Sequence, residues 1–127
     1  MERLFWICFA GALGTGARYL IGLWAGQRLG TSFPYGTLIA NVGGCFLLAA
    51  ILQAALNMAA FSPTLRLALT TGLMGGLTTY SSFAYETTRL AQDGAVGAAL
   101  MNFGLTTLAC FGAVLLGLAL GQRLSGA

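Results

Sequence analysis

The sequence has very few charged residues. Of its 127 residues, 6 are Lys or Arg and 3 are Asp or Glu, which together make 7% of the chain, while 57% are hydrophobic. Soluble domains carry roughly 25% charged residues because their surface faces water. So few charges cannot cover a water-soluble surface, and the composition predicts an integral membrane protein rather than a soluble enzyme.

Histidine is absent, and cysteine occurs only 3 times. Cys8, Cys45 and Cys110 lie in apolar stretches without C-x-x-C spacing, which favours small packing residues over disulfides or metal ligands. With no histidine and no acidic cluster, a transition-metal site is not expected. The basic residues are scattered singly along the chain, which argues against nucleic-acid binding.

Long charge-free stretches supply the material for transmembrane helices, each of which needs about 20 mostly apolar residues. These stretches are 29–65, 67–85 and 94–122, and the stretch 4–27 contains only Arg18. We expect one all-α domain over residues 1–127 with four transmembrane helices. The expected helices cover about 3–29, 35–60, 64–91 and 95–124. Ser62 is the expected N-cap of the third helix.

The arginines divide almost evenly between the two sides of such a bundle. Four spans place Arg3, Arg66 and Arg123 on one side and Arg28 and Arg89 on the other, with Arg18 nearer the second side. Membrane orientation follows asymmetry in Lys and Arg, and here there is almost none. A chain that inserts in both orientations favours an antiparallel homodimer, and a weakly fixed single orientation is the alternative.

The third expected helix contains a segment of low helix propensity. Residues 72–83 place adjacent glycines before paired threonines and paired serines. Non-helical backbone at membrane depth is tolerated where it is buried in protein or lines a polar cavity. Released carbonyls at such a break can coordinate a cation. We expect the third helix to be broken near its middle, the alternative being an unbroken helix with a Gly-rich packing contact.

Aromatic and polar side chains inside the spans are candidates for an anion path. Tyr80 and Phe83 share a helix face, and the positive edge of an aromatic ring can face an anion, although core packing is the alternative. A buried amide at Asn41 offers donors. A polar track is expected where Thr37 pairs with Asn41 on the second expected helix and where Asn102, Thr106 and Cys110 line one stripe of the fourth.

Two charged side chains fall within or at the end of spans. A charge inside a membrane is by default a functional hypothesis. Arg18 could attract an anion into a vestibule. Glu86 could line the pore, or it could instead be neutralised by Arg89, which follows it on the same helix.

Residues 11–19, 36–41 and 72–83 resemble the three signature stretches of the Fluc (CrcB-type) fluoride channels. The run Gly-Gly-Leu-Thr-Thr-aromatic-Ser-Ser-Phe within the third stretch is more specific than a packing pattern. The resemblance covers all four spans. It implies a passive fluoride-selective channel in the bacterial inner membrane that exports cytoplasmic fluoride. It also implies an antiparallel, dual-topology homodimer with two pores and a central structural sodium ion.

The resemblance also implies roles for particular residues. Backbone carbonyls of Gly75 and Thr78 would hold the sodium ion, and Arg18 would be a vestibule arginine. The fluoride path would comprise Asn41, Tyr80, Phe83, Ser81, Thr37, Glu86, Asn102, Thr106 and Cys110. The family usually has Phe where this chain has Tyr80, so we expect a pore with altered throughput.

Two other functions compete with a channel. A small multidrug transporter also has four helices and dual topology, but it needs a carboxylate embedded in its first helix. Here that helix has no acidic residue beyond Glu2, which argues against proton-coupled transport. A non-transporting subunit of a larger membrane complex is the third possibility, and it would not need a break in the third helix.

Overall fold

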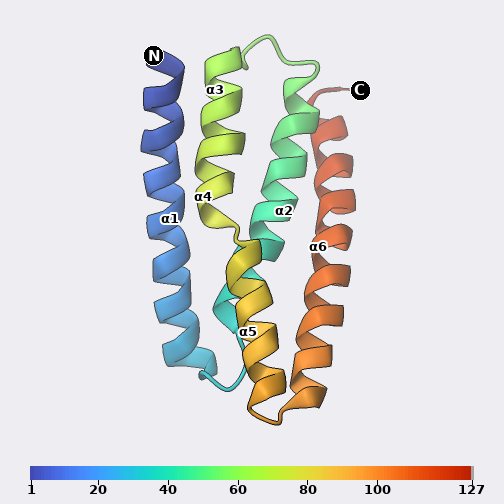
Figure 1. The fold of residues 1–127 in the computed structure, drawn as a ribbon. Helices are drawn as coiled ribbons and strands as arrows, with labels where there is room; N and C mark the ends of the chain where they lie inside the picture. The colour runs from blue at the N-terminus through green and yellow to red at the C-terminus, as the bar shows by residue number, and fades with distance from the viewer. Residues whose placement is uncertain (127) are drawn as a thin grey trace.

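The structure, a computed structural model, describes residues 1–126, which form helices joined by short turns (Figure 1). The elements are α1 (Glu2–Leu29), α2 (Tyr35–Ala55), α3 (Pro63–Leu67), the π-helix η1 (Ala68–Met74), α4 (Gly75–Leu77), α5 (Tyr80–Gln92) and α6 (Val96–Leu124). Three of them, α1, α2 and α6, are long and apolar enough to cross a membrane. The prediction of an all-α membrane protein is confirmed at this level.

The elements form an up-and-down bundle. Helices α1, α2 and α6 each run the length of the molecule, and the segments from α3 to α5 follow one another along it (Figure 1). The start of α1, the α2–α3 loop and the end of α6 lie at one end. Because α2 and α6 both run toward that end, they are parallel neighbours, and they pack along each other.

The second helix is shorter than predicted. It ends at Ala55 rather than near Ala60, because the chain turns at Leu56 and Asn57, where the Asn57 amide bonds the Ala54 carbonyl at 3.4 Å. Asparagine favours turns because its side chain competes for backbone hydrogen bonds. The chain restarts at Ser62, whose hydroxyl accepts a hydrogen bond from the Leu65 amide at 3.1 Å, so the predicted N-cap is confirmed.

Close approaches between helix backbones depend on glycine. A Cβ added at Gly14 of α1 would lie 2.1 Å from the carbonyl oxygen of Leu73. A Cβ at Gly117 of α6 would lie 2.2 Å from the carbonyl oxygen of Phe46 on α2. Small residues let membrane helices pack at such short range, and here they bring α1 against η1 and α6 against α2.

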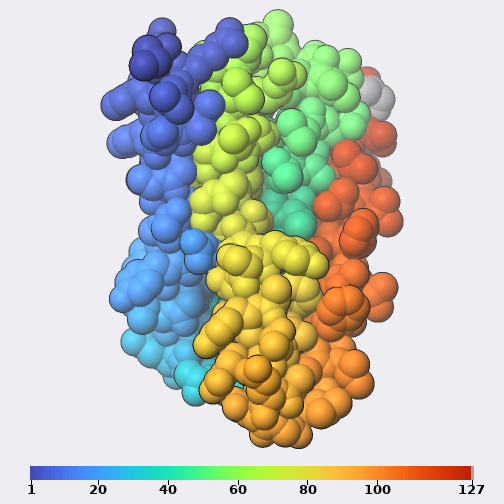
Figure 2. Space-filling view, in the orientation of Figure 1, coloured from blue at the N-terminus to red at the C-terminus, as the bar shows by residue number. Residues whose placement is uncertain are grey.

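Between α4 and α5 the backbone leaves the helical conformation. Thr78 has φ −88° and ψ 152°, and Thr79 has φ −152° and ψ 116°, so both residues are extended. Before this interruption the chain packs on α1, whereas α5 packs on α6. Figure 2 shows the consequence, because α2 is visible in the upper half of this face and α5 covers the lower half.

Candidate functional site

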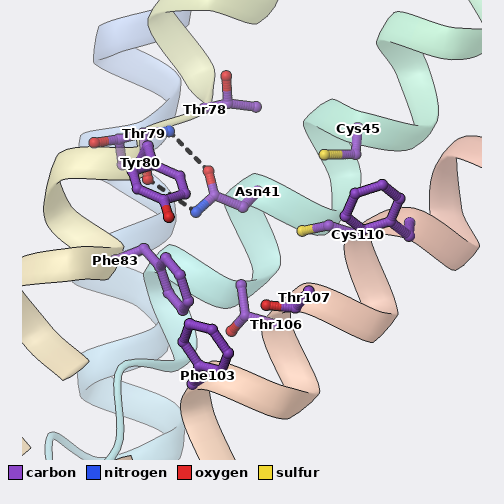
Figure 3. Close-up of a pocket in the computed structure, with 11 residues that line it drawn as sticks. Asn41, Cys45, Thr78, Thr79, Tyr80, Phe83, Phe103, Thr106, Thr107 and Cys110 are labelled. Carbon is purple, nitrogen blue, oxygen red and sulfur yellow. Dashed lines mark hydrogen bonds between the residues drawn. The ribbon is translucent and has the colours of Figure 1, made fainter.

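A cavity of about 440 Å³ lies beside the interruption, between α2, α5 and α6 (Figure 3). Its lining is Asn41, Cys45, Thr78, Thr79, Tyr80, Phe83, Phe103, Thr106, Thr107, Cys110 and Phe111. This lining combines aromatic rings with neutral hydrogen-bonding groups and contains no charged side chain. Such a space suits a small ion that has to be bound without a fixed counter-charge.

The Asn41 side chain holds the extended residues in place. Its Nδ2 donates to the Thr79 carbonyl at 3.0 Å, and its Oδ1 accepts from the Thr79 amide at 2.7 Å (Figure 3). Asn41 is only 7% exposed, so these bonds are shielded from water. An amide nitrogen carries two N–H groups, and the second is therefore left for a ligand in the cavity.

The interruption releases two backbone carbonyls from the helical ladder. In a continuous helix the Gly75 carbonyl would accept from the Thr79 amide, but that amide donates to Asn41. The Thr78 carbonyl would accept from the Ser82 amide, which donates instead to the Thr79 hydroxyl at 3.2 Å. Free carbonyls at an unwound helix are the oxygen donors that sodium ions take in transporters. The donor set at Gly75 and Thr78 therefore fits sodium.

Three aromatic rings follow one another along the cavity. Tyr80 and Phe83 meet edge to face, with centroids 5.6 Å apart and an interplanar angle of 70°. Phe103 of α6 stacks on Phe83 at 6.2 Å. Tyr80 is 78% exposed, and its hydroxyl has no hydrogen-bond partner within residues 1–126. Phe103 of α6 thus adds a third ring, from a second helix, to the expected pair of Tyr80 and Phe83.

A chain of hydrogen bonds runs from Thr106, in the cavity lining on α6, to α5. The Thr106 hydroxyl donates to Asn102 Oδ1 at 3.1 Å, and Asn102 Nδ2 donates to the Thr87 hydroxyl at 2.8 Å. Thr87 in turn donates to the Phe83 carbonyl at 2.7 Å. Asn102 is 1% exposed, so it ties the helices together without reaching the cavity.

Glu86 is held by Thr37. The Thr37 hydroxyl donates to Glu86 Oε1 at 2.8 Å, and the buried Oε2 atom has no partner among the described residues. Arg89 instead forms an ion pair with Asp93 at 3.5 Å. Within residues 1–126, Arg89 is therefore paired with Asp93 rather than with Glu86.

Arg18 bonds the segment just before the interruption, and Ser81 lies against a residue of the interruption itself. Arg18 Nε donates to the Gly76 carbonyl at 3.1 Å, which attaches α1 to α4. The Ser81 hydroxyl lies 3.2 Å from that of Thr79 and is exposed. Neither side chain lines the cavity.

Comparison with known proteins identifies the family. Residues 5–118 match the family model described as CrcB-like protein, Camphor Resistance (CrcB). The chain belongs to the CrcB-like family. A curated relative from Sorangium cellulosum, named fluoride-specific ion channel FluC, is 52% identical over 124 residues and covers 98% of each chain. The predicted resemblance is thereby confirmed.

Further relatives with the same name align over almost the whole CrcB-like chain. One from Anaeromyxobacter dehalogenans is 48% identical over 126 residues, 99% of this chain and 100% of that protein. One from Acidobacterium capsulatum is 45% identical over 122 residues, 96% and 98% of the two chains. Together with the three apolar helices, these matches establish a multi-pass membrane protein.

The CrcB-like cavity gathers about half of the residues expected from sequence. Expected residues in its lining are Asn41, Thr78, Tyr80, Phe83, Thr106 and Cys110. Expected residues outside the lining are Arg18, Thr37, Gly75, Ser81, Glu86 and Asn102. Of these, Arg18 holds the Gly76 carbonyl, Thr37 and Glu86 bond each other, and Asn102 bonds Thr87.

Sequence inspection missed some contributors. On α6 these are Phe103, Thr107 and Phe111, which repeat every fourth residue and form a stripe directly beside the expected polar one. Thr87 also went unnoticed, although it lies one helical turn after Phe83 on the same face. In both cases the helical spacing groups these residues on one face. It does not show which face of the helix points toward the cavity.

Proposed function

We propose that this CrcB-like chain is a fluoride-selective channel that lets fluoride leave the bacterial cytoplasm passively across the inner membrane. The cavity beside the interruption is the observation that carries the proposal, because it joins a shielded amide to a series of aromatic rings. Nearly full-length relatives named as fluoride-specific ion channels support it. The function is therefore that of a channel and not of an enzyme.

Fluoride is small and strongly hydrated, so a pore has to replace its water while binding it weakly enough to release it. The second N–H of Asn41 supplies a donor on the cavity side. The rings of Tyr80, Phe83 and Phe103 supply positive edges without a fixed charge that would trap the ion. A membrane potential of 100 mV, negative inside, favours export of a monovalent anion by about 2.3 kcal/mol.

The segments from α3 to α5 act, in this proposal, as one membrane-crossing helix broken at Thr78 and Thr79. A second, antiparallel copy of the chain would complete each of two pores. The even division of the arginines supports dual orientation. Tyr80 and Phe111 line the cavity yet are largely exposed in one chain, which supports a wall supplied by the second copy.

A structural sodium ion would be held by the carbonyls of Gly75 and Thr78, at the centre of this dimer. Bound there, it would supply positive charge and link the two broken helices. Replacing sodium by N-methylglucamine is expected to slow fluoride efflux, and readdition should restore it. A purified chain whose mass in detergent equals one copy, 13.1 kDa, would contradict the dimer.

The direct test is fluoride efflux from liposomes that contain the purified protein, with chloride as the comparison ion. We expect fast fluoride efflux and negligible chloride efflux. Protein-free liposomes measure the leak. Equal efflux of both ions, or no efflux above the leak, would overturn the assignment.

A further inference from the structure

Two cysteine side chains from different helices share the cavity. Cys45 of α2 and Cys110 of α6 both line it, and both are free cysteines that are partly buried. Figure 3 shows their sulfur atoms turned from the two helices toward the same space. Both thiols therefore open onto one space rather than onto separate surfaces of the bundle.

The packing of α2 on α6 keeps these thiols together. The helices are parallel, and the glycine contact at Gly117 brings α6 against the Phe46 carbonyl, immediately after Cys45. Gly121 makes the next contact one turn on, where a Cβ would lie 2.7 Å from the Ala50 carbonyl. Two backbone contacts in one register prevent the helices from sliding, so the position of each thiol along the cavity is fixed.

The ligand set restricts the class of metal that these thiols could bind. No group of three or more His, Cys, Asp or Glu side chains occurs within residues 1–126. Zinc in proteins takes three or four such ligands, so a zinc site is excluded by donor number. Soft thiolate ligands select soft metals, and among these Hg²⁺, Ag⁺ and Cu⁺ are satisfied by two sulfur atoms.

We propose that Cys45 and Cys110 form a two-thiol site for a soft, two-coordinate metal cation, and that a metal bound there obstructs the cavity. With mercuric chloride, each thiol loses its proton to water, two Hg–S bonds form and two chloride ions leave. The thiolate is the binding form, so two protons are released for each Hg²⁺ bound. Mercuric chloride is uncharged, which lets it enter a cavity that has no charged lining.

Metal binding is tested on the full chain in detergent, without fluoride, so that the result does not depend on the channel function. The Cys8→Ala variant serves as the parent because Cys8 is exposed on α1. We expect one Hg²⁺ and two released protons per chain, and one proton per metal after the additional change Cys45→Ser. Two thiols held together also gain an effective-concentration advantage of about 10²-fold or more over one thiol.

Competition with a monothiol measures that advantage. Cys8→Ala protein should need about 100-fold more N-acetylcysteine to release its Hg²⁺ than the Cys8→Ala/Cys45→Ser protein. Equal competitor concentrations, or one proton per metal in both proteins, would overturn the two-thiol site. Thermal unfolding of both proteins checks that the serine variant is folded, and Cys45→Ala provides a second variant of similar size.

Obstruction is tested separately by fluoride efflux, with each protein normalised to its own rate before metal. Mercuric chloride should block Cys8→Ala protein, and a dithiol should reverse the block at concentrations where N-acetylcysteine does not. The Cys45→Ser protein should lose this difference between the two thiol reagents. Metal binding without any decrease in efflux would show that the site lies off the ion path and would overturn the second half of the proposal.

Discussion

Asn41 pairs with both backbone groups of Thr79, donating to its carbonyl at 3.0 Å and accepting from its amide at 2.7 Å. One side chain on α2 thus takes the place of the helical hydrogen bonds that the interruption removes. The same pair of bonds frees the Gly75 carbonyl. The extended backbone next to the cavity is therefore a consequence of one buried amide.

Replacing Asn41 by alanine should slow fluoride efflux by about tenfold or more and weaken the fold. Both backbone groups of Thr79 would lose their buried partners, at about 1–3 kcal/mol each. A loss of that size in ion binding corresponds to about tenfold or more in rate. Liposome efflux and thermal unfolding measure the two effects. Asn57→Ala, in the exposed α2–α3 turn, is the matched control and should change neither.

Replacing Tyr80 by phenylalanine should raise fluoride efflux. The ring and its contact with Phe83 at 5.6 Å remain, and only a hydroxyl at the cavity wall is removed. A hydroxyl binds fluoride or water more tightly than a ring edge does, which slows passage. The control is Tyr85→Phe, an exposed residue of the same helix that does not line the cavity. Unchanged efflux in Tyr80→Phe would show that the hydroxyl has no part in throughput.

Thr87 should matter through the partner it gives to Asn102. Valine has nearly the same shape but no hydroxyl, so Thr87→Val leaves the buried Asn102 amide without its acceptor, at a cost of about 1–3 kcal/mol. The temperature of thermal unfolding and the rate of fluoride efflux should both decrease, and Thr87→Ser should restore both. Thr88→Val is the control because its hydroxyl bonds only its own helix, at the Ala84 carbonyl. Equal behaviour of the two valine variants would contradict this role.

The helix contact at Gly117 should not tolerate a methyl group. A Cβ there would lie 2.2 Å from the Phe46 carbonyl, so Gly117→Ala should destabilise the fold by about 1–3 kcal/mol through overpacking. Gly97 lies on the same helix with open space around its Cβ position. Gly97→Ala should therefore leave the free energy of unfolding almost unchanged, because Gly97 lies in the first turn of α6 and its added methyl group meets no neighbour. Thermal unfolding that ranks the two variants in the opposite order would contradict this packing.

The amino-acid sequence by itself determined that this is a helical membrane protein of the CrcB-like family. The scarcity of charge and the long apolar stretches specify membrane helices, because lipid cannot hydrogen-bond an exposed backbone. The motifs also pointed to Asn41, Tyr80 and Phe83, which the cavity brings together. These are local properties, and a local pattern is sufficient to find them.

Only the tertiary structure decided which side chains face the cavity and which face one another. Helical spacing groups residues on a face but leaves the rotation of the helix open, so it did not show that Asn102 bonds Thr87 and lies outside the cavity lining. For the same reason Cys45 of α2 and Cys110 of α6, which the sequence does not connect, come to line one cavity. This arrangement depends on the close contact of α2 with α6 at Gly117. Packing between segments that are far apart in the chain cannot be deduced from either segment alone.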